Sequence, residues 1–140
     1  MPIRSKQPSR RERGVALVEF AFTFPIVLLL VMGAFDLGWA VYAKNSVSLA
    51  AREGARRAII TGNSDDIVRA AAKNASQGLA LTDADIVITP SQNGSAPYRQ
   101  PRTSVTVVVR YAYHPITPVI APFIPGGSLM IGSSATMIVE

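Results

Sequence analysis

A single carboxylate, Glu19, lies inside a run of residues that is otherwise apolar enough to enter a membrane. The run continues from Phe20 to Phe35 without any charge, and a charged side chain near the bilayer core costs roughly 2.5–3.5 kcal/mol. Ionisable residues in such positions usually serve a function. Gly14 lies shortly before Glu19 and directly follows the basic segment RRER. This pattern predicts a cleavage site at the membrane surface, followed by an acidic residue that acts inside the membrane.

The chemistry expected at Gly14 is hydrolysis of its peptide bond by a partner enzyme, because glycine supplies backbone freedom just before the helix begins. A cut between Gly14 and Val15 would leave a new ammonium group on Val15, four residues before Glu19. Residues at this spacing lie on one face of a helix. We therefore expect Glu19 to neutralise either the amine of its own chain or that of a neighbouring subunit. The second arrangement would favour assembly in a defined register.

The composition favours a membrane-anchored chain and excludes several other classes. Hydrophobic residues make up 49% of the 140 positions and charged residues only 16%, which is an apolar balance for a soluble domain. Most of the net charge of +5 lies in residues 1–14, so it gives no evidence of a nucleic-acid surface. The chain has no cysteine, which excludes disulfides, thiolate chemistry and cysteine metal sites.

Three segments are expected along the chain: a basic leader over residues 1–14, a transmembrane helix over residues 15–43 and an exported head over residues 44–140. The excess of Lys and Arg before the span predicts a cytoplasmic N-terminus and a head on the outer side of the membrane. The helix is expected to continue past the membrane to about residue 60, because no proline interrupts that stretch.

The length of the apolar run matches a bilayer. Val15 and Asp36 would be ~31 Å apart along a helix, against roughly 30 Å for the hydrocarbon core. Asp36 is therefore expected at the far interface with its carboxylate in water. Trp39 and Tyr42 follow it, as in the aromatic belts of membrane proteins.

Periodicity predicts the remaining elements of the head. Beyond the membrane the long helix carries an apolar stripe, formed by Val47, Ala51, Gly54, Ala55, Ala58 and Ile59. A second helix is expected from about Ser64 to Gly78, with a buried face of Ala70, Ala71 and Ala75.

The chain then changes to the two-residue period of strands, over residues 85–89, 103–113 and 128–139. In the second of these one face is formed by Val105, Val107, Val109, Tyr111 and Tyr113. The expected fold class is therefore α+β, in which a long N-terminal transmembrane helix continues into a small head with a second helix and a short antiparallel sheet.

A charged segment, AAREGAR, lies on the helix beyond the membrane. Its residues Arg52, Glu53, Gly54 and Arg56 are candidates for contact with a partner protein, and a merely solvated helix face explains their charges equally well. Glu53 precedes Arg57 by four residues, which is the favourable order for an ion pair on a helix.

No group of residues predicts catalysis. His114 is the only histidine and has no metal or triad partners near it in sequence. Asp83 and Asp85 lack the further ligands of a calcium loop. Asp65 and Asp66 are better explained as the start of the second helix, where they complement its dipole. We therefore expect no enzyme activity, no cofactor and no metal.

Three segments together resemble the TadE-like family of tight-adherence (Flp) pilus minor pilins, or pseudopilins. They are GVALVEF over residues 14–20, which is similar to a prepilin cleavage motif, AAREGAR over residues 50–56, and ATM over residues 135–137 followed by the terminal Glu140. Phe20 stands where related sequences often have tyrosine.

The resemblance implies a pilin-like head and a structural role. A prepilin peptidase would cut between Gly14 and Val15, and Glu19 and Phe20 would serve in recognition and assembly. The implied partners are that peptidase, other pilin-like subunits, the pilus assembly platform and the lipid bilayer, without nucleic acid. The implied location is the bacterial inner membrane, crossed once.

Two other hypotheses remain open from the sequence. Val41 and Ala43 have the spacing of a signal-peptidase site. A cut after Ala43 would yield a secreted or membrane-anchored binding domain, although it leaves Glu19 and Pro25 without explanation. The third hypothesis is an enzyme tethered to the outer face of the membrane, and it requires a polar constellation that the sequence does not show.

Overall fold

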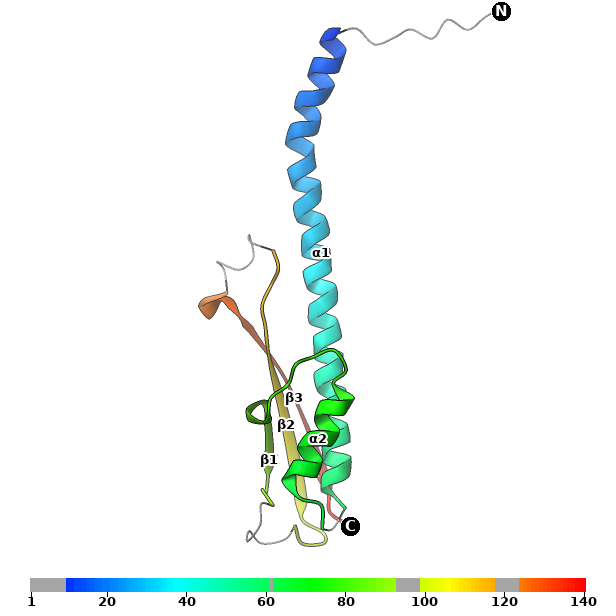
Figure 1. Cartoon of the computed structure of the whole chain (residues 1–140), viewed down its shortest axis with the longest axis vertical. Helices are drawn as coiled ribbons and strands as arrows, with labels where there is room; N and C mark the ends of the chain where they lie inside the picture. Colours follow the sequence, from blue (N-terminus) through cyan, green and yellow to red (C-terminus); the bar gives the residue numbers. More distant parts are fainter. Residues whose placement is uncertain (1–9, 61, 93–98, 118–123) are drawn as a thin grey trace, which may run out of the picture.

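The computed structural model describes residues 10–60, 62–92, 99–117 and 124–140. Its longest element is α1 (Arg10–Ala58), a single helix that continues through Pro25. The N-terminal half of α1 projects alone, and its C-terminal half packs against the head (Figure 1). The helix thus continues past residue 43 and ends at Ala58, close to the end expected near residue 60. Its start lies earlier than expected, because the leader residues from Arg10 onward are helical, and Gly14 lies inside the helix rather than before it.

The head combines one further α-helix with a three-stranded antiparallel sheet in the order β1-β2-β3. The elements after α1 are α2 (Asp65–Ala75), the short 3-10 helix η1 (Asp83–Asp85), β1 (Ile86–Thr89), β2 (Ser104–Tyr113), the 3-10 turn η3 (Pro125–Gly127) and β3 (Leu129–Ile138). Both α1 and α2 pack against the sheet, and the C-terminus lies near the end of α1 (Figure 1). The predicted α+β class is confirmed.

The central strand β2 fixes the register of the sheet. Val105, Val107 and Val109 are completely buried, and Val107 pairs with Ile88 of β1 and Ala135 of β3. A slip by one residue would turn all three valines to solvent, so the alternating pattern specifies this pairing. The predicted inward face of β2 is confirmed.

Small side chains allow α1 to approach the rest of the head closely. Its packed face contains Ala43, Val47, Ala50, Ala51, Ala55 and Ala58, all without exposed surface. At Gly54 an added Cβ would lie 3.1 Å from Cγ1 of Val107 and 3.4 Å from Cβ of Ala72. Gly54 therefore marks the point where α1, α2 and β2 meet, and the predicted stripe of α1 is the buried one.

The predicted buried face of α2 is wrong by about one residue. Val68 and Ala72 are buried, whereas Ala70 is exposed and Ala71 and Ala75 are half-buried. Alanines occur on several sides of this helix, so their small apolar area gives little preference for one orientation. The valine and the buried Asp65 at the start of the helix determine which side faces inward.

Candidate processing and assembly site

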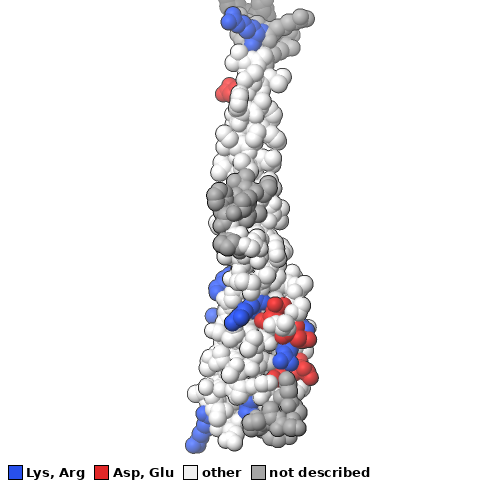
Figure 2. Space-filling view, turned by 90° about the vertical axis from the view of Figure 1, so that its left-hand side faces the viewer, with Lys and Arg blue, Asp and Glu red and all other residues white. Residues whose placement is uncertain are grey.

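The N-terminal half of α1 has the dimensions and composition of a membrane span. In the part of the chain that the structure describes, α1 is the one helix long and apolar enough to cross a bilayer, and its most apolar window is entirely unburied. Phe20, Phe22 and Leu30 expose 63%, 74% and 70% of their surface. Figure 2 shows charged side chains near the upper end of this shaft and on the head, with an uncharged stretch between them.

The predicted processing residues lie together on this bare helix. Val15 and Glu19 line the same shallow surface hollow, together with Arg11, Gly14 and Val18, so the expectation that they share one face is met. A Cβ added to Gly14 would have no neighbour within 4 Å. Among residues whose side chains the structure describes, no ion pair reaches Glu19. The carboxylate of Glu19 thus lies on an exposed surface among apolar side chains.

Phe20 continues this surface on the neighbouring side of the helix. Its ring is stacked on that of Phe24, one turn further on, with ring centroids 5.3 Å apart. The pair forms an exposed aromatic ridge beside Glu19, which can contact lipid or another apolar helix.

The AAREGAR segment divides into an inward and an outward half. Gly54 is buried in the head, as described above, and cannot contact a separate protein there. Arg52 and Arg56 are exposed and Glu53 is half-buried. Glu53 forms the predicted ion pair with Arg57, at 3.5 Å. Only the outward charges of this segment therefore remain available to a partner.

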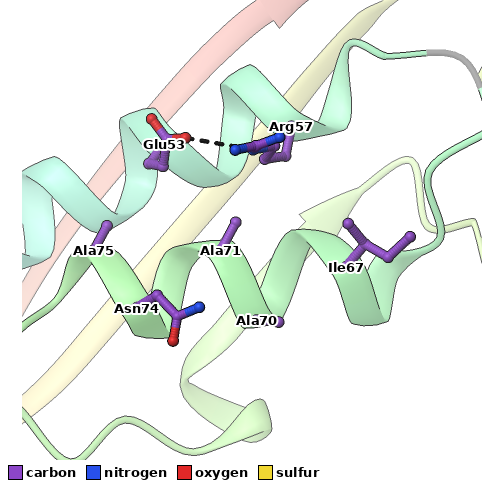
Figure 3. A pocket seen from close by; sticks show the side chains of 7 residues that line it. All are labelled: Glu53, Arg57, Ile67, Ala70, Ala71, Asn74 and Ala75. Carbon is purple, nitrogen blue, oxygen red and sulfur yellow. Dashed lines mark ion pairs between the residues drawn. The ribbon is translucent and has the colours of Figure 1, made fainter.

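An open groove runs between α1 and α2 beside these charges. Glu53 and Arg57 line it from α1, and Ala71 and Ala75 of α2 point toward them (Figure 3). The groove has a volume of about 490 Å³, and its other lining residues include Ile67. It exists because the alanines of α2 leave space where larger side chains would have met α1.

The structure corrects the expectation for Asp36. Its side chain does not face water but is 4% exposed. The carboxylate accepts hydrogen bonds from the Tyr113 hydroxyl at 2.8 Å and from the backbone amides of Ile116 and Thr117 at 2.9 Å each. The chain continues beyond β2 beside α1 (Figure 1), and the carboxylate of Asp36 accepts its free amides. Sequence reasoning missed this contact because its partners lie far along the chain.

A second buried carboxylate, Asp65, was predicted only as a helix start. It begins α2 as expected, but it is completely buried and paired with Arg99, which is 3% exposed. The Asp65 carboxylate also accepts the backbone amide of Gln92 at 2.9 Å. Arg99 donates further to the carbonyls of Ala58 at 3.4 Å and Asn63 at 3.2 Å. This network joins the end of α1 to the start of α2 and has a structural role.

The carboxylates of η1 also have structural partners. Lys73 of α2 lies 2.7 Å from Asp83, and this hydrogen-bonded ammonium lowers the pKa of Asp83. Asp85 accepts the amide and the hydroxyl of Thr82, at 2.8 and 2.7 Å. Within the residues that the structure describes, no three His, Asp or Glu side chains lie close enough together to hold a metal ion.

The long exposed apolar helix fits a single-pass membrane protein, and it continues into a small α+β head. The family model described as TadE-like protein matches residues 14–56. The predicted resemblance is therefore confirmed over α1, including the Gly14–Phe20 segment and AAREGAR, which is less than half of the chain. Members of this family are structural components of the Tad pilus. Neither the curated proteins nor the solved structures include a match to this chain.

Proposed function

We propose that this protein is a TadE-type subunit that is cut after Gly14 by a prepilin peptidase and then takes part in assembling a Tad pilus at the bacterial inner membrane. The observation that supports this most strongly is the placement of Val15 and Glu19 on one face of an unpacked apolar helix. The head uses none of these side chains, so they are free to serve processing and assembly.

Hydrolysis of the peptide bond between Gly14 and Val15 adds water across it, leaving a carboxylate on the leader and an ammonium group on Val15. Because the helix already includes Gly14, the peptidase must unwind this turn to reach the bond. Glycine lowers the cost of unwinding by roughly 0.5–1 kcal/mol relative to alanine. The open surroundings of Gly14 leave room for the enzyme.

The new ammonium group and Glu19 then carry opposite charges in an apolar setting. An unpaired charge there is expensive, and a pair between neighbouring subunits would remove two such charges at one defined axial offset. In this proposal the pairing selects the register in which subunits leave the membrane and meet the assembly platform. The adjacent ridge of Phe20 and Phe24 would supply apolar contact beside the ion pair.

The signal-peptidase alternative loses support from the position of Ala43. This residue lies within the C-terminal third of α1 and has no exposed surface. A cut after Ala43 would sever the helix within the core of the head, between buried side chains such as Val47. The head would lose the helix turn that anchors its membrane-proximal end.

N-terminal sequencing of the protein from the membrane fraction tests the processing step. A mature chain beginning at Val15 supports the proposal. A chain beginning at Lys44 indicates the signal-peptidase route, and one beginning at Met1 or Pro2 indicates an uncut anchor. Either of these results overturns the proposed cleavage.

The variant Glu19→Gln tests the assembly step, since it removes the charge and keeps the shape of the side chain. We expect membrane insertion to persist while the amount of assembled pilus falls sharply. Asp66→Asn is the control, because it removes an exposed carboxylate of α2, outside the apolar span and outside the AAREGAR segment, and should leave piliation intact. Normal piliation in Glu19→Gln would refute the pairing role.

A further inference from the structure

We propose that the membrane-proximal end of the head is itself immersed in the interfacial layer of the bilayer, on the head's side of the membrane. The surface concerned, called the rim below, consists of Ile116 after β2 and of Leu129 and Met130 at the start of β3. These side chains expose 72%, 48% and 60% of their surface. The inference rests on the proposed membrane anchoring and adds a second lipid contact to it.

Hydrogen bonds place the rim at the level of Asp36 on α1. The amide of Ile116 donates directly to the Asp36 carboxylate at 2.9 Å. Leu129 pairs across the sheet with Tyr113, whose hydroxyl donates to the same carboxylate, and Met130 pairs with Ala112, the preceding residue of β2. The three rim residues therefore share the axial height of Asp36.

This height coincides with the end of the hydrocarbon layer. A helix from Val15 to Asp36 extends ~31 Å, close to the roughly 30 Å that the hydrocarbon core requires. On α1 itself, Leu37 and Val41 remain 71% and 57% exposed just beyond this level. Together with Leu129 and Met130 they line an open groove of about 490 Å³. The rim thus extends an apolar surface that the bilayer already covers.

The distribution of charge beside the rim favours lipid as the occupant. In the described residues from 113 to 117 and from 124 to 131 there is no acidic side chain. Gly132 lies two residues beyond Met130 along β3. Its carbonyl accepts a hydrogen bond from the Lys44 ammonium at 2.6 Å, and Gly132 pairs across the sheet with the exposed Arg110. These cations would lie ~7 Å further from the membrane centre than Met130. The phosphate groups of lipids lie at about this distance outside the hydrocarbon core.

A protein surface in the headgroup layer is expected to have apolar side chains next to the hydrocarbon and cationic side chains slightly further from the membrane centre. The rim and its neighbouring cations have this arrangement. A second copy of the chain is the competing occupant. It would have to displace lipid from a surface that is continuous with the span, and the cations of both copies would approach one another.

The absence of cysteine from the chain allows a direct test. Single-cysteine variants Ile116→Cys and Met130→Cys are labelled with an environment-sensitive fluorophore and reconstituted into phosphatidylcholine vesicles that contain a lipid with a shallow spin label. Ile138→Cys is the matched control, since Ile138 is 67% exposed at the opposite end of the same strand. Leu28→Cys reports on the span, and for this variant the vesicles contain a lipid with a spin label deep in its acyl chain, because Leu28 would lie near the bilayer centre. All four positions expose at least part of their side chain, so labelling spares the core.

We expect the labels at Ile116 and Met130 to show blue-shifted emission and strong quenching by the spin-labelled lipid, and the label at Ile138 to show neither. Quenching at Leu28 without quenching at the rim overturns this inference and leaves the membrane anchor intact. No contact with lipid at Leu28 overturns the anchor and, with it, the proposed function. A blue shift at the rim that rises with protein density but is not accompanied by quenching identifies a second copy as the occupant and also overturns the inference.

Discussion

The hydroxyl of Tyr113, at the end of β2, donates a 2.8 Å hydrogen bond to the carboxylate of Asp36 on α1, 77 residues earlier in the chain. The same carboxylate accepts the amides of Ile116 and Thr117. One acidic side chain thereby ties the end of β2 and the residues after it to α1. If the apolar half of α1 spans a bilayer as proposed, this contact sets the position of the head relative to the membrane.

The variant Tyr113→Phe should destabilise the head by about 1–3 kcal/mol, because it leaves a buried carboxylate without one of its donors. Denaturant unfolding of the detergent-solubilised protein measures the loss. Tyr111→Phe is the control, since Tyr111 lies two residues earlier on the same strand, is half-buried and donates no hydrogen bond to the described residues. A loss of equal size in both variants would show that ring packing, rather than the bond to Asp36, is responsible.

Stability should also fall in alkaline solution as Tyr113 ionises. Burial first, and then the hydrogen bond to Asp36 and its negative charge, raise the pKa of Tyr113 from 10.0 to about 12. The folded protein therefore retains this proton at a pH where the unfolded chain releases it, so the contribution is complete below pH 10.0 and is lost as pH rises toward about 12. Unfolding free energies measured across this range should decline less steeply in Tyr113→Phe than in the unmodified protein.

The regular part of the fold could be predicted because its apolar residues recur with the period of one element. Val105, Val107 and Val109 alternate along β2, and Val47 and Ala51 recur on one face of α1; both sets are buried as expected. The face of α2 was misjudged because alanines on several sides leave the period ambiguous. Periodicity determines an orientation only where large and small, or apolar and polar, side chains contrast.

The polar contacts could not be predicted, since their partners share no periodic relation. Asp36 with Tyr113 and Asp65 with Arg99 join segments that are far apart in the chain. For the candidate site, the four-residue spacing of Val15 and Glu19 correctly placed both on one surface. The cleavage after Gly14 and the role of Glu19 in assembly stay predictions.

The close packing at Gly54 should not tolerate a larger side chain. Gly54→Val adds a branched group where a Cβ alone would already lie 3.1 Å from Val107, and overpacking of this kind costs about 1–3 kcal/mol. Gly38→Val is the matched control on the same helix, because a Cβ there meets nothing within 4 Å. Denaturant unfolding of the head should show a lower midpoint for Gly54→Val and little change for Gly38→Val. If the midpoint of Gly54→Val is unchanged, α1 and β2 can move apart at this point without any loss in the free energy of unfolding.

The pair of Asp65 and Arg99 should be the most sensitive polar contact of the head. Arg99→Met removes the nearest cationic partner of a fully buried carboxylate and leaves it only Arg69, 4.0 Å away, and breaking a buried pair in this way costs about 3–5 kcal/mol. The variant also removes the donors to the carbonyls of Ala58 and Asn63. Arg57→Met is the control: its ion pair with Glu53 is half exposed and is worth at most about 1 kcal/mol.

The double variant Asp65→Leu with Arg99→Met separates the two contributions. It removes both buried charges, so it should recover a large part of the stability lost in Arg99→Met alone, as replacement of buried ion pairs by apolar side chains often does. Urea unfolding of the three variants in one detergent gives the comparison. If Arg99→Met costs no more than Arg57→Met, Arg99 does not hold the end of α1 to the start of α2. If the double variant is less stable than Arg99→Met, the contacts that Asp65 keeps with Ser91, Gln92 and Arg69 outweigh the cost of burying its charge without Arg99.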